Sequence, residues 1–196
     1  MRYQRKIVLS LLAASGFGLL AALLAGRGAE AQPQSRWVEL AKLDVKARDL
    51  VVTWLSKDCE AAERRRLITD LTAVGVRLEP AFREAYRLGP PPERIERARA
   101  VAKAAFEQRQ AWLRENGEKM LGEEARTLLA MTPDAYVDRQ LANVALGWRE
   151  RALMGLGLVG DDKALAELQR MAADPKEPLA AAAKRGIEER ANLQKQ

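Results

Sequence analysis

The chain has 196 residues, with 33 basic and 27 acidic side chains and a formal net charge of +6. It has no histidine and one cysteine, which excludes the commonest general base, an intramolecular disulfide and a multi-thiolate zinc site. An apolar fraction of 48% beside 31% charged residues is typical of a globular protein rather than a disordered one.

The first 31 residues have the pattern of a secretory signal peptide. Three basic residues precede an apolar run from 7 to 25, and the small residues Ala29 and Ala31 follow. We therefore expect cleavage between Ala31 and Gln32, and an exported protein that is periplasmic or secreted. An anchor that stays uncleaved is the alternative, because the apolar run nearly reaches the about 20 residues that span a bilayer.

Cleavage changes the charge of the protein. The signal segment holds four basic residues and one acidic residue, so residues 32–196 carry a net charge of only +3. This charge is too small for a nucleic-acid footprint, and we expect no nucleic-acid partner. Contact with a membrane is expected only through the signal segment, if it is uncleaved.

Helix-forming residues and helix-capping residues fill the rest of the chain, and no strand is predicted. Asp44, Asp58, Thr132 and Asp161 are predicted N-caps, and Gly75, Gly89, Gly117 and Gly160 are predicted stops. The predicted helices span 45–55, 58–74, 80–88, 93–116, 123–130, 133–159, 162–173 and 179–191. The sequence therefore predicts an all-α fold.

The predicted helix ends repeat along the chain. The longer helices stop at Gly75, Gly117 and Gly160, which are 42 and 43 residues apart, and the shorter partner helices repeat this spacing. A long and a short helix recurring every 40–47 residues is the period of HEAT and armadillo arrays.

Residues 149–168, with the sequence RERALMGLGLVGDDKALAEL, resemble a HEAT-like repeat of the bacterial lyase-associated type. Weaker copies cover 63–71 and 78–86. The resemblance implies a HEAT-like α-solenoid of about three to four helix pairs over 58–196, with 32–57 as N-terminal capping helices. An irregular helical bundle is the alternative. Repeats of this kind are mostly binding surfaces, so the resemblance implies a scaffold rather than an enzyme.

Three glycines and four tryptophans stand out. Gly155, Gly157 and Gly160 match the spacing of a dinucleotide-binding fingerprint, but they end a predicted helix instead of following a strand. We expect them to allow close helix packing. Three of the tryptophans are expected to pack in the core: Trp54, Trp112 and Trp148. The fourth, Trp37, is predicted to anchor a partner or to cap the first helix pair.

The sequence shows no catalytic apparatus. No nucleophile motif or P-loop is present, and the carboxylate pairs at Asp161 and Glu123 have the simpler role of starting helices. We therefore expect no catalytic residue, no cofactor and no metal. Cys59 lies between two acidic residues, which disfavour a reactive thiolate, and its pairing state between chains stays open.

Two classes of function follow. The first is an exported, non-enzymatic adaptor or accessory subunit that binds another envelope or periplasmic protein. Its contact residues are expected on the second helix of each pair, at Arg83, Arg87, Glu167 and Arg170. The alternative is a periplasmic protein that binds a small ligand or lipid between helix pairs.

Overall fold

A computed structural model describes residues 37–56 and 60–195, which belong to one compact unit, Arg36–Gln196. All regular structure in these ranges is helical, so the all-α prediction is confirmed for this part of the chain. The elements are α3 (Val38–Lys42), α4 (Val45–Ser56), α5 (Ala61–Val74), the 3₁₀ turn η1 (Gly75–Leu78), α6 (Glu79–Leu88), α7 (Pro92–Leu121), α8 (Glu123–Leu129), α9 (Pro133–Val159), α10 (Asp162–Ala173) and α11 (Ala180–Leu193). The predicted signal segment, Asp58 and Cys59 lie outside the described residues.

Local capping signals fix several helix starts. The side chain of Asp44 accepts a hydrogen bond from the Ala47 amide at 2.9 Å, and that of Asp161 accepts one from Ala164 at 2.8 Å. Thr132 accepts from the Ala135 amide at 3.2 Å, ahead of a proline in the first turn of α9. These three predicted N-caps are confirmed, because each satisfies an amide that has no partner within its helix.

The predicted stop at Gly117 is wrong. Helix α7 continues through Gly117 to Leu121 and ends at Gly122, whose φ of 55° lies in the left-handed region. A Cβ at Gly117 would lie 3.0 Å from that of Ala125, so this glycine gives α8 room to fold back on α7. The longer helices therefore stop at residues 75, 122 and 160, and the period of 42 and 43 residues is not kept.

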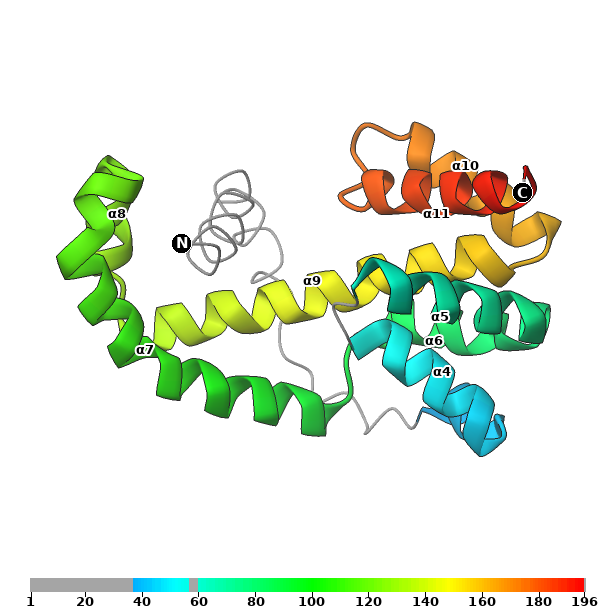
Figure 1. The fold of residues 1–196 in the computed structure, drawn as a ribbon, viewed down its shortest axis with the longest axis horizontal. Coiled ribbons are helices and arrows are strands. Elements are labelled where there is room, and N and C mark those ends of the chain that lie inside the picture. Colours follow the sequence, from blue (N-terminus) through cyan, green and yellow to red (C-terminus); the bar gives the residue numbers. More distant parts are fainter. Residues whose placement is uncertain (1–36, 57–59, 196) are drawn as a thin grey trace. The chain divides into compact units, whose positions relative to one another are not determined.

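Helix α9 joins two regions of the fold. Its first half runs antiparallel beside α7, and its second half packs against α5, α6, α10 and α11 (Figure 1). The hydrophobic core surrounds this second half, where every residue from Ala152 to Gly160 is buried. Among the described residues, none from α7 or α8 belongs to this core.

Glycines allow helices to approach α9 closely, as predicted. The ring of Phe82, from α6, packs against Gly155 in the space that a Cβ would fill. At Gly157, a Cβ would lie 2.5 Å from the backbone carbonyl carbon of Gly186, so α9 and α11 cross backbone to backbone. The packing interpretation of these glycines is confirmed.

Two of the three tryptophans predicted for the core are there. Trp54 and Trp148 are buried, and Trp54 donates a hydrogen bond to the carbonyl of Arg151 at 2.7 Å. The prediction for Trp112 is wrong: it is half-buried on α7, with the Arg109 guanidinium 5.5 Å from its ring centre. An apolar stripe buries a side chain fully only where other helices cover it, and α7 lies outside the core.

Candidate functional site

The part of the fold that stands apart from the core is a helical hairpin. It consists of α7, α8 and residues 133–147 of α9, and we call it the arm. Helix α7 has 30 residues, so it is about 45 Å long. The amide side chain of the buried Gln110 donates to the Leu128 carbonyl at 3.1 Å, which ties α8 to α7. Phe106 and Tyr136 join α7 to α9, with ring centres 5.5 Å apart.

The arm buries few large apolar side chains. Leu113 and Val137 are the large ones among its buried residues; the others are Ala102, Gln110, Gly117 and Ala125. Many of the other large apolar side chains of the arm are half-buried, because a two-helix hairpin has no third helix to cover its flanks. They include Ile95, Phe106, Trp112, Leu128, Leu141 and Val144. The arm therefore presents apolar surface that its own helices leave uncovered.

One face of α7 carries a regular stripe. Ala98, Val101, Ala105, Gln108 and Trp112 are spaced by three and four residues alternately, which places them within an arc of about 80°. Val101 is 65% exposed. The alternation is that of a coiled-coil seam, and the alanines permit the close approach of a second helix. We call these residues the α7 stripe.

The charges of the arm cancel. Between residues 92 and 147 the sequence holds nine basic and nine acidic side chains. The arm therefore carries no net charge.

The four residues predicted for partner binding lie on α6 and α10. The guanidinium of Arg83 donates to Glu79 at 2.8 Å and to Glu167 at 2.5 Å, so two of the four pair with each other. Both hydrogen bonds raise the pKa of Arg83 above its ordinary value, and the hydrogen bond to Glu167 has the larger effect. Arg87 and Arg170 are exposed. Partner binding by these residues stays a prediction.

Arg83 has a structural role between helices. Glu79, its partner in α6, also accepts a hydrogen bond from the Asp161 amide at 2.8 Å, at the start of α10. We expect Arg83→Ala to lower the free energy of unfolding by up to about 1 kcal/mol, the upper end of the values for solvent-exposed ion pairs. Arg87→Ala, on the exposed side of the same helix, is expected to change it by less than about 0.5 kcal/mol. Urea denaturation of both variants measures the difference, and equal values would show that the pairing contributes nothing.

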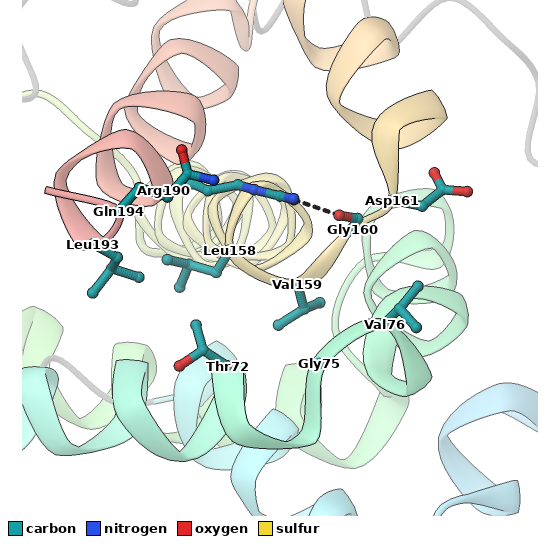
Figure 2. Close-up of a pocket in the computed structure, with 10 residues that line it drawn as sticks. All are labelled: Thr72, Gly75, Val76, Leu158, Val159, Gly160, Asp161, Arg190, Leu193 and Gln194. Atoms are coloured by element: carbon teal, nitrogen blue, oxygen red, sulfur yellow. Dashed lines mark hydrogen bonds between the residues drawn. The ribbon is translucent and has the colours of Figure 1, made fainter.

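A groove lies where the end of α5, the α9–α10 turn and the end of α11 meet. Its volume is about 520 Å³. Figure 2 shows Leu158, Val159 and Leu193 facing this space, while the guanidinium of Arg190 reaches the carbonyl of Gly160. The groove is mainly apolar, and Arg190 is engaged in holding the end of α9 to α11.

The carboxylate pairs are positioned as helix starts. Asp161 caps α10, and Glu123 and Glu124 lie in the first turn of α8. Within residues 37–56 and 60–195, no group of three or more histidine, cysteine, aspartate or glutamate side chains is arranged to hold a metal ion. None of the described helices is both long and apolar enough to cross a membrane.

Comparison with known proteins yields no relative. No family model, no curated protein and no solved structure matches the chain.

The α7 stripe is the feature that the sequence interpretation missed. Its signal is present in the sequence as the alternating spacing from Ala98 to Trp112. The sequence instead predicts a core position for Trp112, because spacing along one helix does not say whether another helix lies over it. In the folded chain Val101 is exposed, which shows that no other described helix covers the stripe at this position.

Proposed function

We propose that the protein is an exported, non-enzymatic adaptor whose arm binds a helix of another envelope protein. The observation that carries this proposal is the α7 stripe, in which Val101 and Gln108 are exposed and the other three residues are half-buried. It lies on an arm whose described residues bury only Leu113 and Val137 as large apolar side chains. Export is proposed from the basic and apolar N-terminal segment and from the small residues before Gln32.

The energetics of the arm support a partner. Long helices in proteins usually depend on a packed apolar face, and the described residues of the arm bury only Leu113 and Val137 as large apolar side chains. A helix along the α7 stripe supplies such a face.

The chemistry of the arm indicates what kind of helix fits. The α7 stripe runs from Ala98 to Trp112, so a partner helix of about 21 Å covers its length. It needs an apolar seam with the same alternation of three and four residues, and charges of both signs beside it, because the arm is electrically neutral. The partner is therefore an amphipathic helix and not a polyanion.

The HEAT-like array forms part of the proposal. Helix α5 is followed by the shorter α6, and α9 by the shorter α10, and both α6 and α10 pack on α9. In this proposal the two pairs are repeat units, and α7 with α8 extends the array between them. An irregular helical bundle that carries the same arm is the alternative.

Charge placed in the stripe tests the proposal. We expect Ala105→Glu to abolish recovery of the partner when tagged protein is purified from envelope extract, because a buried carboxylate without a partner is strongly disfavoured. Ala100→Glu is the matched control, since Ala100 is exposed about 120° away from the centre of the stripe. Recovery of the same partner by both variants, with equal melting temperatures, would refute arm binding.

Self-association is the other outcome that this test must separate. Analytical ultracentrifugation of the purified protein measures it directly. A dimer that Ala105→Glu dissociates and Ala100→Glu leaves intact would assign the stripe to a second copy of the chain, and not to another envelope protein.

The groove favours a second candidate function, the binding of a small apolar ligand or lipid. Its volume of about 520 Å³ lies within the range of ligand pockets, and Leu158, Val159 and Leu193 supply apolar contacts. Native mass spectrometry of protein purified from the envelope tests this function. A bound lipid lost in Val76→Asp, at an exposed position of the groove lining, would support it, and a ligand-free mass would count against it.

A further inference from the structure

The short helix α3 lies at the edge of the core and is held to it by the side chain of Glu84, by Trp37 and by Leu40, which packs half-buried against the core. None of its five residues is buried. Its first amides meet the side chain of Glu84, from α6, and Trp37, which precedes it, meets Trp148 of α9. We call Trp37 and α3 together the strap.

Glu84 holds the strap through the backbone. Its carboxylate accepts from the amides of Val38 at 2.8 Å, Glu39 at 3.0 and 3.1 Å, and Leu40 at 3.0 Å. Glu84 is only 4% exposed. A carboxylate suits this place, because the amides at a helix start have no partner within the helix. The strap and the buried charge therefore satisfy each other.

Trp148 connects the strap to the arm. The ring of Trp37 packs edge-on against it, with ring centres 5.7 Å apart. The guanidinium of Arg94, in the first turn of α7, lies 5.3 Å from the centre of the Trp148 ring. Arg94 also donates to the Ser56 carbonyl at the end of α4, at 2.8 Å. We call the first turn of α7 the root of the arm. Its Arg94 thus rests on Trp148, the same ring that Trp37 of the strap covers.

Trp148 has no other polar support in the described part of the chain. Its indole Nε1 is buried and has no acceptor there. Buried indole N–H groups usually find one. The position of the ring therefore depends on packing by its neighbours, and Trp37 is one of them.

We propose that the strap opens while the core stays folded, and that opening loosens the root of the arm. Opening returns the Glu84 carboxylate and its partner amides to water together, so neither is left buried without a partner. It also uncovers one edge of Trp148, against which Arg94 positions the start of α7. Segments with few buried contacts open locally in this way.

The strap has a consequence for binding. If the strap controls the arm, it also regulates binding of the partner, and this part of the inference rests on the proposed function. The coupling between Trp37 and α7 does not rest on the proposed function, and it can be measured on the purified protein without a partner.

Hydrogen exchange followed by mass spectrometry tests the coupling on the purified protein. Trp37→Ala and Glu84→Gln are expected to raise exchange at least tenfold in 38–42 and severalfold in 92–99 and 142–150. Exchange in α10 and α11 is expected to stay unchanged. Val38→Ala is the control, because Val38 is 48% exposed and only its backbone amide meets Glu84. This variant is expected to match the unmodified protein in all these segments.

Two results would overturn the proposal. Faster exchange in 38–42 without any change in 92–99 would show that the strap is not coupled to the arm. Loss of protection in α10 and α11 as well, in both variants and in the milder Trp37→Phe, would show that α3 is part of the core. Neither result bears on the α7 stripe, because Ala105→Glu tests partner binding without touching the strap.

Discussion

Replacing Gly157 by alanine is expected to lower the free energy of unfolding by about 3 kcal/mol or more, the upper range for overpacking in a protein core. The added Cβ would lie 2.5 Å from the carbonyl carbon of Gly186 and 2.6 Å from its oxygen. These are backbone atoms, so the clash is relieved only if α9 and α11 move apart. The crossing of these helices covers one side of the core, and its separation exposes buried apolar surface.

The same substitution at Gly147 is the control. Gly147 lies in α9 as well, but its Cβ would meet only the flexible end of Arg151, at 3.5 Å. Since glycine within a helix is less favourable than alanine by about 1 kcal/mol, Gly147→Ala is expected to stabilise the protein slightly. Urea denaturation followed by circular dichroism measures both variants. Equal effects at the two positions would contradict the close crossing of α9 and α11.

Gly155→Ala is expected to lower the free energy of unfolding by about 2–3 kcal/mol, because the new methyl group occupies the position of the Phe82 ring. Phe82 is fully buried and cannot swing out of the way. Phe82→Leu alone is expected to cost about 1 kcal/mol, since leucine fills part of the space of the ring.

The double variant distinguishes this contact from a general defect. Phe82→Leu makes room for the methyl group that Gly155→Ala adds, so the two changes together are expected to cost less than their sum by about 1 kcal/mol or more. A complete cycle of denaturation measurements gives this coupling energy. Additive effects would mean that α6 and α9 do not meet at Gly155 in solution.

Local signals in the sequence predict most helix boundaries, because a cap acts within a few residues of itself. Asp44, Thr132 and Asp161 each bond an amide three residues ahead, which the sequence displays directly. Gly117 misleads because its role is tertiary. It accommodates Ala125 of the next helix, and a glycine in that role has the same local appearance as a helix stop.

The candidate site was less accessible to prediction. The sequence predicts a partner-binding surface with Arg83 and Glu167, but their spacing gives no sign that they pair across α6 and α10. The role of Glu84 is equally hidden, because the amides that it binds are 44–46 residues away. The α7 stripe was visible as a spacing, but only the folded chain shows Val101 exposed.

Photo-crosslinking in the cell envelope tests the central proposal, binding of a partner helix by the arm, most directly. A crosslinking amino acid placed at Val101 lies on the α7 stripe, and one placed at Ala100 lies off it on the same helix. We predict that position 101 crosslinks to a helical segment of one envelope protein, and that position 100 does not. Crosslinks of equal yield at both positions, or none at either, would contradict the proposal.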